Sequence, residues 1–183
     1  MAPAKKQYLQ NEAICNPRLT NRSDCVPASL RFLDPACGCG NFLVVTYREL
    51  RLLELEVVWK LYADAQFQAL FKVDALLMVD VDQMHGIEIE EWPARIAEVA
   101  MWLIDHQMNQ GVGAKFGQPV LRLPLTKSAK IHLGNALRTD WNDVLPAKRC
   151  SFVLGNPPFV GKKEQNATQK ADLKRMFTPT PGW

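Results

Sequence analysis

The most distinctive residues of the chain lie in the stretch FLDPACGCGNFL, Phe32 to Leu43. An apolar run stops at Leu33, a carboxylate follows at Asp34, and two cysteines alternate with two glycines before a helical pattern begins. Glycine weakens strands and helices alike, so this junction predicts a backbone that another group approaches closely. The alternative is a tight turn that only packs the helix. The spacing lacks the third glycine of a dinucleotide fingerprint and the Gly-Lys-Ser/Thr of a P-loop.

The tetrapeptide NPPF, Asn156 to Phe159, is the second candidate for chemistry. Its prolines fix φ and contribute no N–H, so an Asn side-chain oxygen and a proline carbonyl form a rigid pair of acceptors. Such a pair suits an amino group with two N–H donors, and Phe159 offers a face on which a base can stack. The stretch therefore predicts a site for a planar amine. A strand followed by a rigid turn is the alternative.

A third candidate is Glu88, near the end of the apolar stretch MHGIEI. A carboxylate there, beside the glycine-rich loop, could accept both hydroxyls of a ribose, as acidic residues do in nucleotide sites. The alternative is a solvated charge at a strand terminus. Glu90 and Glu91 compete for the role, but they are better explained as favouring the positive end of the next helix.

Apolar runs that alternate with helical patterns predict an α/β fold with a mostly parallel sheet. In such sheets, ligands bind beyond the carboxyl ends of the strands. Asp34, Glu88, Asn135 and Asn156 each lie at or just past the end of an expected strand. The four expected strands are Leu30–Leu33, Met84–Ile89, Lys130–Leu133 and a run within Cys150–Phe159.

The helical patterns lie between these runs. One helix is expected from Asn41 to about Ala65, with Arg51 and Glu54 among the polar residues between its apolar positions. A second helix follows Pro93, and the run from Asn109 to Pro119 is expected to be a loop that ends it. Its apolar face is expected to be Ile96, Val99, Ala100, Leu103 and Met108. Residues 66–83 are partly helical in pattern, and a last helix is expected over Glu164–Met176.

Length and composition indicate an ordinary soluble domain. The chain has 183 residues, 48% of them hydrophobic and 22% charged, and a net charge of +3, which is too small to argue for nucleic acid. Five irregularly spaced cysteines favour reduced thiols over a disulfide framework, and three histidines have no metal-ligand or triad spacing. Without a signal-peptide or membrane-span pattern, a cytoplasmic location is expected.

Four stretches, in this order, resemble motifs I to IV of the S-adenosylmethionine-dependent DNA amino-methyltransferases: DPACGCGNFL, GIEIEE, GNAL and NPPF. Their order is that of the gamma class, which makes N6-methyladenine. The segments HGIEIEEWPARIAEVAMWLIDHQMN and GNPPFVGKK, with Phe32 to Leu55, resemble the methyltransferase region of single-chain type IIG/IIL restriction-modification enzymes. The resemblance covers residues 31 to about 175.

The resemblance implies part of a Rossmann-like class I methyltransferase fold, with its later strands missing. Residues 1–29 would form a weakly structured arm, 30–160 the S-adenosylmethionine-binding core, and 161–183 a helix and tail. The later motifs and a target recognition domain are not found, so a truncated chain or one that needs a C-terminal portion or partner subunit is expected.

The resemblance also implies roles for individual residues. Asp34 and the backbone of Ala36, Cys37, Gly38 and Gly40 would hold the amino and carboxylate end of S-adenosylmethionine. In the same comparison, Glu88 would take the ribose hydroxyls and Ile89 would pack on the cofactor adenine. Asn135 stands where many relatives have Asp, and would contact the exocyclic amine of the cofactor.

The implied reaction is methyl transfer to the N6 amine of a DNA adenine. Asn156 and the Pro157 carbonyl would accept hydrogen bonds from N6, and Phe159 would stack on the base after it flips out of the duplex. No metal is required, because the methyl sulfonium is already activated. Protein-glutamine and RNA guanine-N2 methyltransferases also use an NPP-aromatic motif, and remain alternatives, as does a non-catalytic remnant.

Overall fold

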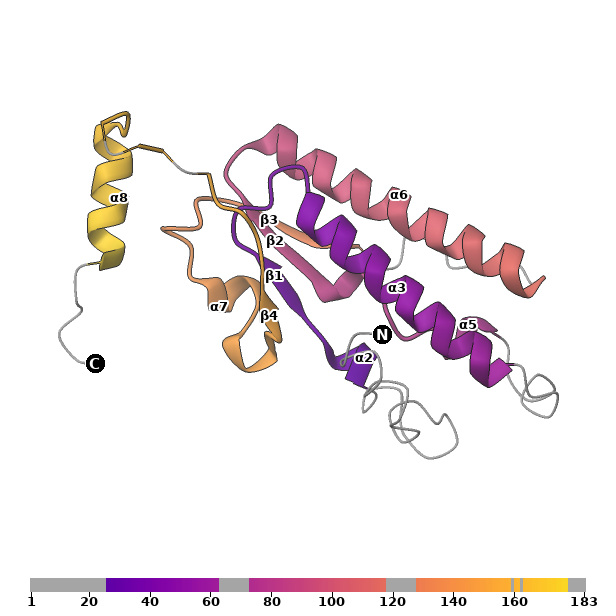
Figure 1. The fold of residues 1–183 in the computed structure, drawn as a ribbon. Coiled ribbons are helices and arrows are strands. Elements are labelled where there is room, and N and C mark those ends of the chain that lie inside the picture. Colours follow the sequence, from indigo (N-terminus) through magenta and orange to yellow (C-terminus); the bar gives the residue numbers. More distant parts are fainter. Residues whose placement is uncertain (1–25, 63–72, 118–127, 159, 162, 178–183) are drawn as a thin grey trace.

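The computed structural model describes residues 26–62, 73–117, 128–158, 160–161 and 163–177. Within them, four strands form one parallel sheet in the order β3-β2-β1-β4 (Figure 1). These strands are β1 (Phe32–Asp34), β2 (Met84–Glu88), β3 (Lys130–Leu133) and β4 (Phe152–Val153). The expected α/β class with a parallel sheet is confirmed, and β4 lies beside β1.

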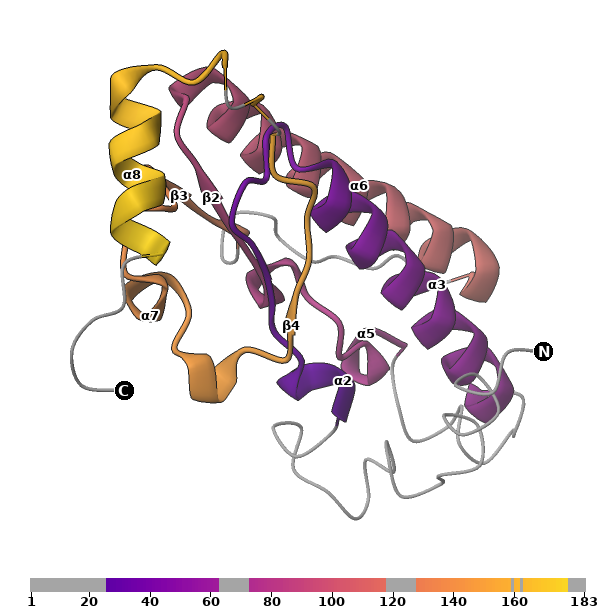
Figure 2. The same ribbon diagram turned by 60° about the vertical axis from the view of Figure 1, so that its left-hand side comes forward.

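Two long helices, α3 (Asn41–Tyr62) and α6 (Glu91–Phe116), lie side by side along one face of the sheet (Figures 1 and 2). No helix of the described part is both long and apolar enough to span a bilayer. The shorter helices are α2 (Val26–Ser29), α5 (Val73–Leu76), the 3-10 turns η3 (Val81–Gln83) and η4 (Ala147–Arg149), α7 (Trp141–Val144) and α8 (Ala167–Phe177).

Alternation along the central strands divides the core between the two faces of the sheet. Phe32 and Met84, which are paired in register, pack with residues of α3 and α6 such as Tyr47 and Met101. Leu33 and Ile87 point to the opposite face and pack around Leu145, just after α7. Since both faces are covered, β1 and β2 are buried along almost their whole length.

Several boundaries differ from the expected ones. Strand β1 begins and ends later than Leu30–Leu33, and only Phe152–Val153 of the run Cys150–Phe159 pairs with it. Part of the expected arm, Val26–Ser29, is a helical turn, and Gln83 Nε2 anchors it by donating to the carbonyls of Pro27 and Leu30 at 2.5 and 3.0 Å. Residues 1–25 and 63–72 lie outside the described residues, and with them the remainder of the arm and the end expected for the first helix near Ala65.

The loop expected over Asn109–Pro119 is wrong as far as Phe116, because α6 continues through it. Each glycine in a helix interior costs about 1 kcal/mol relative to alanine. Between two of them, Val112 is buried against Val58 and Leu76, and this packing offsets the unfavourable propensity. The helix ends at Gly117, whose φ of 65° provides a left-handed cap.

The face of α6 that was expected to be buried is largely exposed. Ile96, Val99 and Leu103 are 48%, 56% and 45% exposed. The buried face instead contains Ala94, Ala97, Met101, Ile104, Asp105, Asn109 and Val112. The reason is close approach: a Cβ placed on Gly40 would lie only 3.1 Å from the Cβ of Ala97. Only a face with small side chains lets α6 pack so near the loop that precedes α3.

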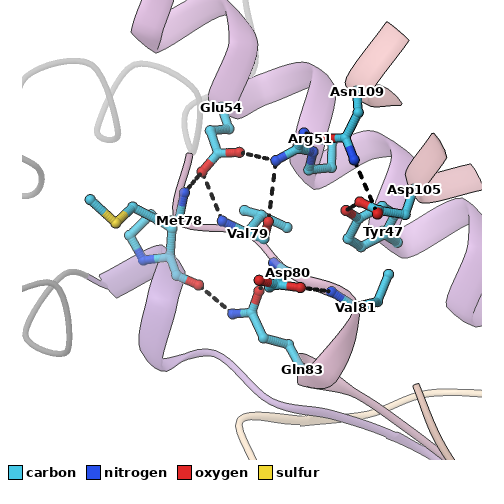
Figure 3. Close-up of polar contacts among 11 residues, drawn as sticks. Tyr47, Arg51, Glu54, Met78, Val79, Asp80, Val81, Gln83, Asp105 and Asn109 are labelled. Carbon is cyan, nitrogen blue, oxygen red and sulfur yellow. Dashed lines mark hydrogen bonds and ion pairs between the residues drawn. The ribbon is translucent and has the colours of Figure 1, made fainter. Parts of the chain in front are cut away.

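Arg51 and Glu54 of α3, expected among the polar residues of that helix, are buried instead (Figure 3). Their side chains form an ion pair with an N···O distance of 3.1 Å. Glu54 Oε1 also accepts the backbone N–H groups of Met78 and Val79, the latter at 2.8 Å. Tyr47, Arg51 and Glu54 lie at i, i+4 and i+7, so all three share one face of the helix.

The ion pair extends into a network that joins α3 to α6 (Figure 3). Arg51 donates to the Val79 carbonyl at 3.2 Å and to Asn109 Oδ1 at 2.7 Å. Asn109 in turn donates to Asp105 Oδ2 at 3.1 Å, and Asp105 Oδ1 accepts from the Tyr47 hydroxyl at 2.5 Å. The network therefore fixes the position of α6 relative to α3 and to the segment before β2.

We predict that Glu54→Ala destabilises the chain by about 3–5 kcal/mol, because it leaves the Arg51 guanidinium buried without its carboxylate. Denaturant unfolding followed by circular dichroism measures this free energy of unfolding. The matched control is Glu49→Ala on the same helix, since the side chains of Arg48 and Glu49 are 47% and 60% exposed. An exposed pair contributes less than about 1 kcal/mol. Equal effects of the two substitutions would contradict the prediction.

Candidate functional site

The four polar residues expected at the strand ends lie at one edge of the sheet, where all four parallel strands end. Asp34 and Glu88 are the last residues of β1 and β2, and Asn135 and Asn156 follow β3 and β4. Hydrogen bonds tie the loops after β1 and β3 to Glu88, at the end of β2. Gly38 N–H donates to Glu88 Oε2 at 2.8 Å, and Gly134 N–H donates to the Glu88 carbonyl at 2.7 Å.

The carboxyl group of Asp34 is fully buried, with 0% of the residue exposed. Its Oδ1 accepts the Ala36 N–H at 3.1 Å, whereas Oδ2 has no hydrogen-bond partner among the described residues. Burial raises the pKa of Asp34, the Ala36 N–H opposes this, and the nearby charge of Glu88 adds to it. An unpartnered carboxylate oxygen in this environment favours a ligand that brings an N–H donor or a positive charge.

The loop after Asp34 folds over the end of β2. Cys37 N–H donates to the Ile87 carbonyl at 3.1 Å, and Gly86 makes room for the side chain, since a Cβ there would lie 2.8 Å from the Cys37 sulfur. Burial, followed by the charges of Asp34 and Glu88, raises the pKa of the Cys37 thiol to about 12. The thiol therefore stays protonated, and the backbone of Cys37 is used within the protein, because its carbonyl also accepts the Gly40 N–H at 2.8 Å.

Gly38 and Gly40 both have positive φ, of 54° and 83°. A Cβ on Gly40 would press against Ala97, so that glycine is required by helix packing. Around Gly38 no atom lies within 4 Å of such a Cβ. Its glycine is therefore required by the left-handed backbone and not by the protein around it, and this face of the loop is open for another molecule.

Two backbone N–H groups hold the Glu88 carboxylate in place. Oε2 accepts from Gly38, and Oε1 accepts the Glu90 N–H at 3.0 Å. Each carboxylate oxygen has a second lone pair, so the group can still accept two hydroxyl donors. Ile89 beside it is 59% exposed and offers an apolar surface. Glu91 lies in the first turn of α6, where its carboxylate favours the helix N-terminus as expected.

The NPPF stretch begins against the Asp34 carboxyl group. A Cβ on Gly155 would lie 2.4 Å from Asp34 Oδ1, and φ at this glycine is 145°, so no other residue fits without displacement. Leu154 N–H donates to the Leu33 carbonyl at 2.9 Å and extends the β1–β4 pairing up to this contact. The Asp34 carboxyl group thus lies between the two segments: the glycine-rich loop follows it in the chain, and Gly155, the residue before NPPF, packs against it.

The acceptors of the planar-amine motif lie on the surface. Asn156 and Pro157 are both exposed, directly after the glycine that touches Asp34. Phe159, expected to stack on the base, lies outside the described residues.

Asn135 has partners that the sequence did not indicate. Its Oδ1 accepts the Leu137 N–H at 2.9 Å, and its Nδ2 donates to Asp172 Oδ2 at 3.0 Å. Arg138 Nε also donates to Asp172, at 2.8 Å. No local pattern could have indicated Asp172, because it lies 37 residues further on, in α8. The amide oxygen of Asn135 keeps one lone pair, so its expected role as an acceptor stays possible.

Comparisons with known proteins agree with the motifs. Residues 13–182 match the family model "MmeI, DNA-methyltransferase domain". DNA methyltransferase A of Bacillus subtilis (strain 168) is 36% identical over 151 residues, which are 81% of this chain and 17% of the relative. The solved structure of the type IIL restriction-modification enzyme MmeI in complex with DNA is 54% identical, with a TM-score of 0.78 over 85% of this chain and 20% of the other.

This chain thus spans about a fifth of the length of each of the two proteins. The family model, in contrast, covers almost all of it. The resemblance to the methyltransferase region of type IIL restriction-modification enzymes is confirmed. The chain belongs to the MmeI DNA-methyltransferase domain family.

Proposed function

We propose that this chain is the part of a DNA adenine-N6 methyltransferase that binds S-adenosylmethionine and presents the target amine to it. The observation that carries the proposal is the contact between Gly155 and the Asp34 carboxyl group. It brings the acceptors that follow Gly155 to the same strand ends as the glycine-rich loop, as transfer between a cofactor and an amine requires. Both similar proteins are described as acting on or binding DNA, which favours DNA over a protein amide or an RNA guanine.

The residues at the strand ends fit the methyl donor. Asp34 Oδ2 lacks a partner and lies near a second carboxylate, so a ligand with an ammonium and a sulfonium group would neutralise the charge there. Glu88 retains lone pairs for the ribose hydroxyls, and the exposed Ile89 can pack on an adenine ring. When bound, S-adenosylmethionine supplies a methyl group that is already activated by its positive sulfur.

The role of the chain in the reaction is to orient the amine and accept hydrogen bonds from it; as the bond from methyl to N6 forms, the methyl–sulfur bond would break, S-adenosylhomocysteine would leave and one N6 proton would be lost to water. The adenine N6 lone pair is delocalised into the ring, so the amine is a poor nucleophile. Hydrogen bonds from N6 to the Asn156 side-chain oxygen and the Pro157 carbonyl favour a tetrahedral nitrogen, and they stabilise the positive charge that develops as the bond to carbon forms. Phe159 stacks on the flipped base. A cytoplasmic location stays a prediction from the sequence.

For the cofactor site, we predict that Glu88→Gln weakens binding of S-adenosylhomocysteine by about 1–3 kcal/mol, because an amide offers one acceptor oxygen where the carboxylate offers two. Isothermal titration calorimetry on the purified chain measures the change. Glu91→Gln is the matched control, since its side chain is 70% exposed in the next helix and should leave affinity unchanged. Folded wild-type chain that released no heat with this ligand would refute the cofactor assignment.

For the amine site, we predict that Asn156→Ala abolishes methyl transfer in a full-length family member with this stretch, while cofactor affinity stays nearly constant. Asn156→Asp keeps an acceptor oxygen and should retain more turnover than the alanine variant. Incorporation of labelled methyl groups into unmethylated DNA measures turnover, and calorimetry measures binding. If the alanine variant kept most of its turnover, the acceptor role of this side chain would be wrong.

A further inference from the structure

The turn after β3 holds the backbone of Asn135 rigidly. The Asn135 carbonyl accepts the N–H groups of Arg138 and Thr139 at 2.8 and 2.9 Å and the Thr139 hydroxyl at 3.0 Å. One residue earlier, the N–H of Gly134 donates to the Glu88 carbonyl. The turn is thus tied directly to the residue expected to bind the cofactor ribose, and the remaining freedom lies in the orientation of the Asn135 amide.

Asp172 removes that freedom. An amide has a donor end and an acceptor end of nearly equal shape, and a carboxylate accepts hydrogen bonds but cannot donate them. Because Nδ2 of Asn135 lies 3.0 Å from Asp172 Oδ2, the nitrogen must face α8. The oxygen must then face the Leu137 N–H, 2.9 Å away, with its second lone pair free. The direction in which this side chain accepts is therefore set from both ends, by the Leu137 N–H of its own turn and by a carboxylate of another helix.

The Asp172 carboxylate is itself buried and hydrogen-bonded. Asp172 is 6% exposed, and its other oxygen accepts from Arg138 Nε at 2.8 Å. The hydrogen bond from Arg138 keeps the pKa of Asp172 below its usual range, so the group is a carboxylate at neutral pH. In Figure 2, α8 lies beside the connection between β3 and α7, where these contacts form.

We propose that Asp172 is a positioning residue for the methyl donor: it orients Asn135 so that the amide oxygen accepts the exocyclic amine of the cofactor adenine. This inference rests on the proposed function. It also accounts for an amide at position 135, because an aspartate there would place two carboxyl groups about as close as the present 3.0 Å contact, which repel each other unless one takes up a proton. One amide and one carboxylate form the complementary pair.

The test compares two ligands that differ at the exocyclic amine and the adjoining ring nitrogen N1, and it uses the change in their affinity ratio between variants. S-adenosylhomocysteine presents an N–H donor to Asn135, and its deaminated counterpart, S-inosylhomocysteine, presents a carbonyl oxygen. Wild-type chain should bind the first more tightly. In Asp172→Asn the amide of Asn135 loses one of the two contacts that orient it and keeps the Leu137 N–H, and the preference should fall by up to about tenfold, the usual cost of one mispaired polar group. Calorimetry with both ligands measures the ratio, and Asp143→Asn, an exposed residue of α7, is the control.

The double variant Asn135→Asp/Asp172→Asn distinguishes loss of the amide–carboxylate pair from loss of the fold. Asn135→Asp alone should lose both affinity and preference, because it opposes two carboxylates. The exchange restores one carboxylate and one amide, so it should recover most of the preference. If Asp172 only anchors α8, Asp172→Asn lowers the unfolding midpoint but leaves the ligand preference unchanged, and this result would overturn the inference alone. Absence of S-adenosylhomocysteine binding by folded wild-type chain would overturn the proposed function with it.

Discussion

The buried carboxyl group of Asp34 constrains everything around it. It lies at the end of the central strand β1 with none of its surface exposed, and one of its oxygens lacks a partner in the described part of the chain. A buried acceptor without a donor is costly, so the neighbouring residues must either satisfy it or leave space for a ligand that does. Here residue 155 must be glycine, because the chain after β4 passes directly against the Asp34 carboxyl group. Glu88 adds a second negative charge nearby. The strand ends therefore suit a ligand that is positively charged and rich in donors.

The buried cluster around Arg51 shows the opposite arrangement. It is as polar as the strand ends, but it pairs a guanidinium with a carboxylate and matches further donors to acceptors between α3, α6 and the segment before β2. One atom of this network, Arg51 Nε, has no hydrogen-bond partner in the described part of the chain, but the charges are paired, so the network positions helices and offers little to a ligand. The two clusters differ in charge: Arg51 pairs with Glu54, whereas Asp34 lies near the like charge of Glu88. The strand ends are therefore the better place for a positively charged ligand.

The same reasoning applies at the far side of the site, in the turn after β3. Asn135 would be ambiguous by itself, since its amide could present either end to a ligand. The Asp172 carboxylate and the Leu137 N–H each select one end, and together they leave a single free lone pair. In our proposal, helix α8 contributes to the site by orienting Asn135. The strand ends and this turn are built from backbone-fixed acceptors, so little reorganisation is needed when a donor-rich molecule binds.

The sequence by itself determined the class of fold and the positions of Asp34, Glu88, Asn135 and Asn156 at strand ends. These depend on local properties, namely apolar runs, glycine and proline at turns, and the rule that ligands bind beyond the carboxyl ends of parallel strands. The strand Lys130–Leu133 was predicted with its observed bounds for the same reason. Such features need information from only a few neighbouring residues.

Only the tertiary structure decided which side of α6 is buried, that Arg51 and Glu54 are internal, and that Asp172 reaches Asn135. Helix α6 has apolar residues on several sides, and the small side chains of Ala94 and Ala97 prevail because another backbone comes within contact distance. Arg51 meets Asn109 and Asn135 meets Asp172 across separations of 58 and 37 residues. Burial and partner choice depend on what packs against a residue, and local sequence contains no record of that neighbour.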